Sequence, residues 1–443
     1  MADLNGNRCA CVIGAGLSGC EAAWQLHRAG VQVKLFEMRP DKATPAHHGG
    51  GFAELVCSNS LRSDSMENAV GLLKEEMRIL GSLIMHAADI SRVPAGSALA
   101  VDRDEFSRIV EAELSGAENI EIIRQEISSF DELPEHDVLV IATGPLSSEA
   151  ICQAISKMTG SNYLHFYDAV APIIYGESIN YDVAYWASRY DKGDADYLNC
   201  PMNTAEYEKF YTELVNAETF KLRDFEQAAY FEGCMPVEVM AKRGLQTLLF
   251  GPLKPVGLND PHTGTIPHAV VQLRKENTQA SLFNLVGFQT SLTRPEQKRV
   301  FSIIPGLEHV EFARHGMIHR NTFINSPELL LATLQMKSDK NILFAGQITG
   351  VEGYVESAAC GLMAGFNAAR IVKGDEPIVF PKETAHGALT AYITAMNRDF
   401  QPMNVNYGIF PPLEDRKIKK SQRKLMYSER AIEIIQTIPK ISN

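Results

Sequence analysis

Residues 9–24 read CACVIGAGLSGCEAAW, and they predict a short apolar strand, a glycine turn and the start of a helix. In a turn with the spacing GxGxxG, the first glycine permits the tight bend and the second lets a pyrophosphate approach the backbone. The third lets the helix pack closely on the strand. The free N–H groups and positive dipole at the helix N-terminus favour phosphates. The sequence therefore predicts a dinucleotide cofactor cradled by Gly14, Ala15, Gly16, Leu17, Ser18 and Gly19.

A second strand is predicted directly after this helix. Residues 31–36 read VQVKLF and are followed by Glu37. An acid at the end of the second strand is placed to accept hydrogen bonds from an adenosine ribose. The complete strand–turn–helix–strand–acid unit is more specific than a glycine pattern alone.

A second strand–glycine–helix unit near the C-terminus favours FAD over NAD. Residues 341–346 predict a buried strand, and the loop that follows carries Gly346, Gln347, Gly350, Gly353 and Tyr354. Residues 355–371 predict a helix rich in small residues. Flavoproteins with a split domain place such a helix N-terminus at the flavin ring, where its dipole stabilises negative charge. No second GxGxxG occurs, so a dedicated nicotinamide-binding domain is not expected.

The chain length and the change of texture along the chain predict an α/β protein with an insertion. A chain of 443 residues is long enough for two or three domains. The expected arrangement is a Rossmann-like FAD-binding domain in two parts, 1–160 and 312–443, with an inserted α+β domain at 161–311. Finer expectations are helices over 54–61 and 68–85, and a strand over 247–250. The strand over 137–143 ends in a small-residue turn at Gly144, which is typical of flavin domains.

The composition excludes several classes of protein. No run of about 18 apolar residues is present, so no membrane span is expected, and no signal sequence opens the chain. We therefore expect a cytoplasmic protein. The eight cysteines form neither CxxC nor a zinc spacing, so no metal site is predicted. The net charge of −12 argues against a wholly basic surface but permits a local basic face. The basic run over 416–424 fits such a face or a solvated helix.

Two cysteines have contexts that suggest chemistry. Cys57 lies between a glycine-rich loop and Arg62, and Cys234 lies in the turn EGCMP, followed by Lys242 and Arg243. A thiol near cations ionises more easily and can then act as a nucleophile. The stretch over 232–258 is dense in glycine, proline and basic residues, which favours a substrate-facing loop.

Together these segments resemble the folate- and FAD-dependent tRNA (uracil-5-)-methyltransferases, the TrmFO family. The likeness runs in order along nearly the whole chain. It is carried by the N-terminal turn with FEMRP at 36–40, and by 54–62, 93–104, 232–258, 286–290, 295–299, 319–327 and 343–365. The segments around Cys234 and His319 are far more specific than the turn, which many flavoproteins share. A local departure is Arg294, where an aromatic residue is common in the family.

The resemblance implies transfer of one carbon from methylenetetrahydrofolate to C5 of a uridine in the tRNA T-loop, position 54. Reduced FAD would be methylene carrier and reductant, and NADH or NADPH the electron source. We expect Cys234 to add to uracil C6 and Cys57 to assist proton transfer or guard the methylene unit, with the reverse assignment open. The base that removes the C5 proton is not identified. Tyr354 would stack on folate or flavin, or pack at a domain seam.

Further contacts follow from the same resemblance. His319, Arg320 and Asn321 could bind flavin or substrate, or scaffold a loop. Arg39 and Gly144 join the cofactor-binding set. Contacts to folate or RNA are expected from Arg62, Lys242, Arg243, Lys254, Phe288 and Tyr354, with Lys298 and Arg299 as further RNA cations. Alternatives are ribosomal RNA as the substrate, a flavin-dependent thiol, quinone or NAD(P)H oxidoreductase, and a non-catalytic flavin-bearing RNA-binding protein. Neither a protein partner nor an oligomeric state can be inferred.

Overall fold

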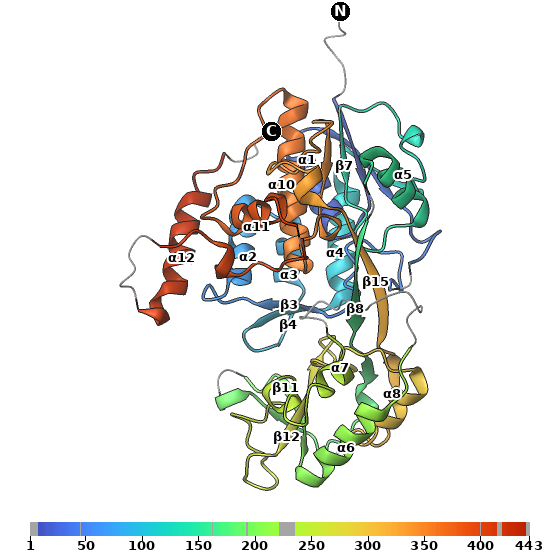
Figure 1. Ribbon diagram of the computed structural model, residues 1–443, viewed down its shortest axis with the longest axis vertical. Helices are drawn as coiled ribbons and strands as arrows, with labels where there is room; N and C mark the ends of the chain where they lie inside the picture. The colour runs from blue at the N-terminus through green and yellow to red at the C-terminus, as the bar shows by residue number, and fades with distance from the viewer. Residues whose placement is uncertain are drawn as a thin grey trace, which may run out of the picture.

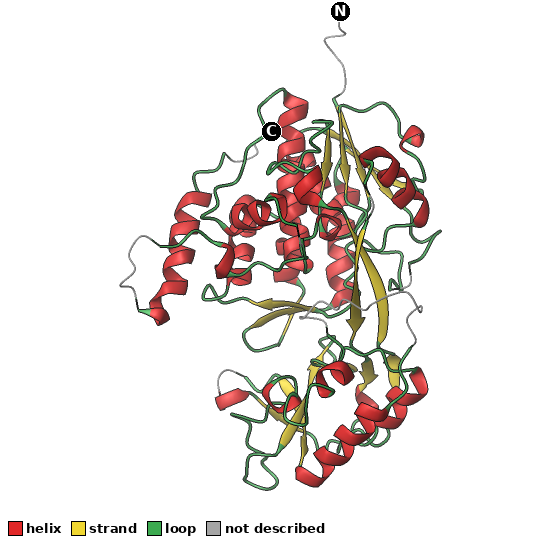
Figure 2. Ribbon diagram, viewed as in Figure 1, coloured by secondary structure: helices red, strands yellow, loops and turns green. Residues whose placement is uncertain are grey.

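The computed structural model describes residues 8–44, 46–161, 163–191, 194–220, 235–398, 400–413 and 419–439. These residues form two domains, of which the larger holds both the N-terminal and the C-terminal parts of the chain (Figure 1). Strands concentrate in the middle of the larger domain, with helices on both sides (Figure 2). The predicted combination of a parallel α/β domain with an inserted second domain is therefore the architecture of the described residues.

A parallel sheet organises the larger domain. Its strand order is β16-β7-β1-β2-β6, and every neighbouring pair is parallel. The order reverses at β1, so the carboxyl ends of β1 and β7 flank the point where doubly wound sheets bind ligands. The strands are β1 (Cys9–Ile13), β2 (Gln32–Glu37), β6 (Ile120–Arg124), β7 (Val138–Ile141) and β16 (Ile342–Phe344).

Both faces of this sheet are covered, as expected for parallel strands. Alternation along β1 sends Ala10 and Val12 into one core and Cys11 and Ile13 into another. The first core lies under several helices, whereas the second is closed mainly by α5 (Glu149–Thr159). The helices around the first core include α1 (Leu17–Arg28), α2 (Ala69–Leu80), α3 (Leu83–Ile90), α4 (Arg103–Gly116), α10 (Tyr354–Lys373), α11 (Ala385–Thr394) and α12 (Lys420–Ile435).

Helices α1 and α10 pack against each other at backbone distance. A Cβ at Gly361 would overlap the carbonyl of Ser18, and one at Gly365 would come within 2.5 Å of the carbonyl oxygen of Ala22. Small residues on α10 therefore let the helices of the two strand–glycine–helix units lie side by side (Figure 1).

The second domain is built on an antiparallel sheet with the order β10-β11-β12-β13-β9-β14. One face packs on α6 and α8 around a separate core that includes Phe210, Phe288 and Phe301. The elements are β9 (Ile173–Tyr175), β10 (Tyr185–Ala187), β11 (Tyr197–Met202), α6 (Thr204–Asn216), α7 (Val237–Ala241), β12 (Ala269–Lys275), β13 (Leu282–Leu285), α8 (Arg294–Phe301) and β14 (Phe312–Arg314).

A two-stranded antiparallel ribbon joins the two domains. It consists of β8 (Leu164–Val170) and β15 (Met317–Phe323), and Figure 1 shows it running from one domain to the other. Its register places His319 opposite Asp168. Beside the ribbon lies a small sheet of β3 (Ser60–Ser63), β5 (Ala98–Val101) and β4 (Arg92–Val93), and the short α9 (Ser326–Leu329) follows β15.

Three of the finer sequence predictions are wrong. Residues 54–59 form a loop that leads into β3, where a helix was expected. The helix predicted over 68–85 is divided by Gly81, which has a left-handed φ of 78° and ends α2. Residues 248–250 form a 3₁₀ turn in place of a strand. Among the described residues, no helix combines the length and apolarity needed to cross a membrane.

Candidate functional site

A cavity of about 460 Å³ opens at the carboxyl ends of all five parallel strands. Its volume falls in the usual range for a small-molecule site. Its lining combines strand ends of the larger domain, the loop around Cys57, the β8–β15 ribbon and the open face of the second sheet. The strand-end residues are Ile13, Phe36, Gln125, Ala142 and Gly346.

The three glycines of the N-terminal turn have different surroundings. Gly14 has a φ of 99°, and a Cβ there would lie 2.5 Å from the carbonyl oxygen of Ala142. A Cβ at Gly19 would overlap the carbonyl of Gly14, so this glycine serves the packing of α1 on β1. Gly16 begins α1 and borders the cavity, and no heavy atom lies within 4 Å of the place its Cβ would take. The turn thus leaves open space where a ligand can approach the backbone.

Glu37 lines the cavity and is fixed by protein donors. It accepts hydrogen bonds from the N–H of Ala15 (2.8 Å) and from Nε of Arg39 (2.9 Å). Burial would raise the pKa of Glu37, but the charge and hydrogen bonds of Arg39 and the Ala15 N–H outweigh it and lower the pKa. Arg39 also forms an ion pair with Glu54 at 3.0 Å. It therefore connects Glu37, at the end of β2, to the loop that precedes β3.

The returning loop reaches the cavity from the other side of α1. Gly346 (φ 86°) lies against Ser18, and Gly353 (φ 111°) precedes the first turn of α10. Gly350 (φ 86°) packs under the ring of Phe400 and does not line the cavity. Three further residues that the sequence predicts to bind the cofactor also line the cavity. They are Gln347 and Tyr354 of the returning segment, and Gly144, which follows β7.

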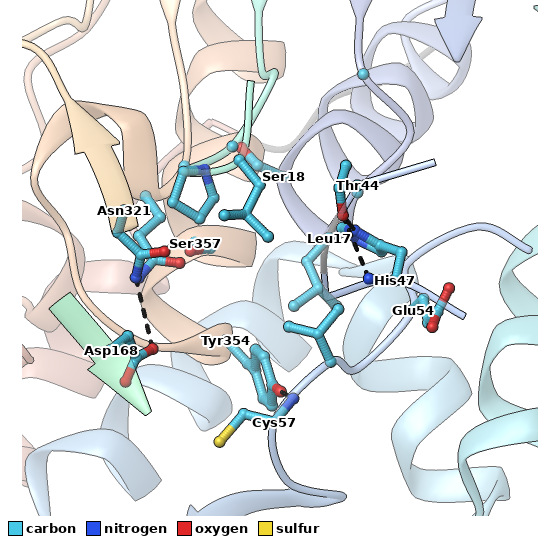
Figure 3. A pocket seen from close by; sticks show the side chains of 18 of the residues that line it. Leu17, Ser18, Thr44, His47, Glu54, Cys57, Asp168, Asn321, Tyr354 and Ser357 are labelled. Carbon is cyan, nitrogen blue, oxygen red and sulfur yellow. Dashed lines mark hydrogen bonds between the residues drawn. The ribbon is translucent and has the colours of Figure 1, made fainter. Parts of the chain in front are cut away.

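Cys57 is held at the first turn of α10. The hydroxyl oxygen of Tyr354 accepts hydrogen bonds from the N–H of Cys57 (2.6 Å) and the N–H of Ser58 (3.2 Å), and Figure 3 shows the two side chains together. Arg103 and Arg314 donate to the carbonyl oxygen of Cys57 at 3.1 and 2.9 Å. Residues from three distant parts of the chain therefore fix this loop.

The thiol of Cys57 is not activated by the cations around it. Burial raises the pKa of Cys57 to about 12, and the charge of Asp168 adds to the rise against the opposing arginines. Arg62, which the sequence places close by, lines the cavity but pairs with the buried carboxylate of Glu356. The expectation of an easily ionised thiol is thus reversed, because the side chain is desolvated while the cations bind backbone oxygens.

Acidic residues that the sequence did not reveal line the same cavity. Asp168 on β8 accepts a hydrogen bond from Asn321 of β15 at 3.5 Å (Figure 3). Glu352, just before α10, is buried and accepts a hydrogen bond from Gln347. Burial, reinforced by the charge of Asp168, raises the pKa of Glu352 well above its ordinary value. The ribbon places Asp168 and His319 together across a long sequence separation, which no local pattern could indicate.

Several buried polar atoms of the cavity have no protein partner. Within the part of the chain that the structure describes, they are Ser18 Oγ, Asn284 Nδ2, His319 Nδ1 and Asn321 Oδ1. Buried polar groups are usually hydrogen-bonded, so a ligand with both donors and acceptors is the natural partner for this set. Burial lowers the pKa of His319, which favours its neutral form.

The remaining predicted residues lie away from the cavity. Phe288 is fully buried in the core of the second domain, edge-on to Phe301, and this burial assigns it to packing. The side chains of Lys242, Arg243 and Lys254 are exposed on the second domain and do not line the cavity. Lys298 is exposed on α8, and Arg299 pairs there with Glu296 and Glu213. Cys234 lies outside the described residues.

The described segment that begins at Met235 contacts a residue that lines the cavity. The N–H of Val237, at the start of α7, donates to the carbonyl oxygen of Gln289 at 2.7 Å, and Gln289 lines the cavity. Among the described residues, no group of three or more histidine, cysteine or acidic side chains is arranged to hold a metal ion.

Comparisons with known proteins give a consistent result. The family model described as glucose inhibited division protein A (GIDA) matches residues 10–376. A relative from Heliobacterium modesticaldum, named methylenetetrahydrofolate–tRNA-(uracil-5-)-methyltransferase TrmFO, is 63% identical over 96% of both chains. A relative of the same name from Bacillus pumilus is 56% identical over 97% of this chain and 98% of its own.

Solved structures show the same fold at lower identity. GidA from Aquifex aeolicus superimposes with a TM-score of 0.68 at 17% identity, over 98% of this chain and 75% of that one. At this identity the likeness concerns the fold alone, and it extends over both domains.

Proposed function

The chain belongs to the GIDA family, within its TrmFO group, and on this premise we propose that it transfers one carbon from methylenetetrahydrofolate to C5 of a uridine in tRNA. The protein is thus a methylenetetrahydrofolate- and FAD-dependent tRNA (uracil-5-)-methyltransferase. We propose the T-loop uridine as the target. Ribosomal RNA is the alternative substrate that the experiment below compares with tRNA.

One geometric observation supports this chemistry above the others. A cysteine, Cys57, is tied by its backbone to Tyr354 at the N-terminus of α10, inside the cavity that the glycine turn borders. Burial raises the pKa of this thiol, which favours its neutral form at neutral pH. Methylation of uracil C5 needs groups that accept and return protons close to the cofactor.

The residues of the cavity fit FAD. Gly16 provides an open backbone cradle for a pyrophosphate at the start of α1, and Glu37 stands at the end of β2, where an adenosine ribose would lie. The partnerless Ser18 Oγ and Asn321 Oδ1 offer a donor and an acceptor. The chemistry that FAD supplies when bound is carriage of the one-carbon unit and delivery of electrons. We propose NADH or NADPH as the source of those electrons.

The substrate explains why a cysteine is required. Uracil C5 is a poor nucleophile until a thiolate adds to C6, because the new C–S bond pushes the electrons of the C5–C6 double bond towards C5. Because the donated carbon is a methylene unit, two further electrons, which bound reduced FAD would supply, are needed to make it a methyl group. Loss of the C5 proton to a base and departure of the thiolate from C6 restore the C5–C6 double bond. We assign the addition to Cys234. The raised pKa of Cys57 supports a second role for that residue, as a neutral thiol that handles a proton.

Two experiments test these assignments. Reduced enzyme is incubated with labelled methylenetetrahydrofolate and either unmodified tRNA or ribosomal RNA, and the nucleosides are analysed. Label in 5-methyluridine of tRNA supports the function, whereas folate-independent NADPH oxidation without label contradicts it. For the cysteines, tRNA containing 5-fluorouridine is used as a trap and adducts are detected by mass spectrometry. An adduct that persists in Cys234→Ala and disappears in Cys57→Ala reverses our assignment.

A further inference from the structure

Tyr190 and Phe250 are the two most exposed large aromatic residues among those of the second domain that the structure describes. Tyr190 is 59% exposed and Phe250 is 80% exposed, although large aromatic residues are usually buried in a fold of this size. Tyr190 follows β10, and Phe250 ends the 3₁₀ turn over 248–250. We refer to Tyr190, Phe250 and Lys254 as the aromatic platform.

Tyr190 is held rigidly in its exposed position. It has a φ of 59°, which is unusual for a residue other than glycine. Its N–H donates to the carbonyl oxygen of Gly257 at 2.7 Å, and its ring lies so close to Gly257 that a Cβ there would be 3.0 Å away. Arg189 reinforces the contact by donating to the carbonyl oxygen of Val256 at 2.8 Å. These contacts together hold the ring of Tyr190 in its exposed position.

Two structural links connect the platform to the cavity. Pro252, between Phe250 and Lys254, lies against Gly287, which lines the cavity, and a Cβ at Gly287 would be 2.5 Å from the Pro252 side chain. On the other side, Arg189 donates to Gln272 at 3.0 Å. Gln272 points to the same face of β12 as Arg274, which also lines the cavity. Sequence neighbours of the platform residues therefore contact the elements that form the wall of the site.

The segment over 239–258, which contains Phe250 and Lys254, has a positive charge, whereas the whole protein is negative. Residues 239–258 contain Lys242, Arg243 and Lys254 but no Asp or Glu, whereas the chain has a net charge of −12. Exposed aromatic rings among cations are the combination with which proteins bind unpaired nucleotides, because the rings stack on bases and the cations neutralise phosphates.

We propose that Tyr190 and Phe250 form a stacking platform for the unpaired bases next to the target uridine, with Lys254 on a neighbouring phosphate. The proposal rests on the proposed function, and it names the surface where the RNA loop docks. A uridine must leave its stack to enter a cavity of this kind. The two exposed rings would replace the stacking that the neighbouring bases lose.

The test uses the full-length holoenzyme and a T-arm hairpin RNA. Dissociation constants are measured by fluorescence anisotropy over a series of salt concentrations for wild type, Tyr190→Leu, Phe250→Leu and Lys254→Gln. We expect each aromatic variant to bind at least about fivefold more weakly with an unchanged salt slope. Lys254→Gln should lower the slope by about one. Tyr190→Phe, which keeps the ring, should restore binding.

Controls separate this surface from folding and from the proposed function. Tyr181, 47% exposed on the same domain, serves as the matched site, and Tyr181→Leu should bind RNA like wild type. FAD absorbance should be retained in every variant. If wild type binds and methylates the RNA and both leucine variants bind it as tightly as wild type, the platform is refuted and the proposed function is not. If wild type binds no RNA, the platform and the proposed function both fail.

Discussion

The hydroxyl oxygen of Tyr354 accepts the backbone N–H of Cys57 at 2.6 Å, across 297 residues of sequence. This bond joins the loop that carries the thiol to Tyr354, the first residue of α10, at the cavity. The sequence predicts that Tyr354 stacks on folate or flavin or packs at a domain seam, and the residue lines the cavity. Its hydroxyl has in addition a positioning role towards Cys57.

The first prediction concerns this bond. Tyr354→Phe keeps the ring but leaves the N–H groups of Cys57 and Ser58 without their acceptor, which costs about 1–3 kcal/mol for a buried donor. We expect a lower Tm, retained FAD and a methyl-transfer kcat reduced at least about tenfold. Tyr407→Phe is the matched control, because its hydroxyl donates to the carbonyl oxygen of Met66 at 2.8 Å and does not line the cavity. Equal loss of kcat in both variants would contradict the positioning role.

The second prediction separates cofactor binding from packing in the glycine turn. Gly16 has open space around its missing Cβ, so Gly16→Ala should leave the Tm of the apoprotein nearly unchanged but weaken FAD binding at least about tenfold. Gly19→Ala should lower the apoprotein Tm itself, because its methyl group overlaps the carbonyl of Gly14. Apoprotein melting curves and FAD titration measure the two effects. A Gly16→Ala apoprotein as unstable as Gly19→Ala would argue against the open cradle.

The third prediction concerns the reactivity of Cys57. A pKa of about 12, against an ordinary value of 9.0, lowers the thiolate fraction at neutral pH by about 1,000-fold. We expect iodoacetamide to label Cys57 far more slowly than a peptide thiol, with a rate that still rises above pH 9.0. Peptide mapping by mass spectrometry gives the rate at this site. Rapid labelling of Cys57 at pH 7 would show an activated thiol and favour the reversed cysteine assignment.

The fourth prediction follows from Glu352. Because folding raises the pKa of this carboxyl above its ordinary value of 4.5, its contribution to stability is complete below that value and is lost as pH rises through the folded pKa. The amide in Glu352→Gln does not ionise. Urea unfolding over a pH series should therefore show wild type losing stability relative to Glu352→Gln as pH increases above 4.5. A difference that does not vary with pH would contradict a buried, proton-bearing carboxyl.

The parts of the site that depend on local sequence could be predicted. The glycine turn, the acid at the end of β2 and the helix after residue 353 are each specified by residues within one supersecondary unit. The loop over 54–59 was wrongly predicted as a helix, because its backbone oxygens are bound by distant side chains. Arg103 donates to Leu55, and Arg314 donates to Val56 at 2.9 Å. Such tertiary contacts override local helix propensity.

Other features depend on pairing between distant segments. Asp168 has no informative neighbours in sequence, and it enters the site only because β8 pairs with β15. Phe288 illustrates the opposite failure. It lies in a segment characteristic of the family, yet its ring packs inside the second domain. Segment likeness does not reveal whether a particular side chain points to the core or to the substrate.

The β8–β15 ribbon has a mechanical consequence. The same two strands that join the domains carry Asp168, His319 and Asn321 into the cavity. A rotation of the second domain about the ribbon would therefore shift these side chains relative to Tyr354 and the glycine turn. The orientation of the second domain would then determine the distance across the cavity. An RNA bound to the second domain would thereby also change the spacing between these side chains and Tyr354.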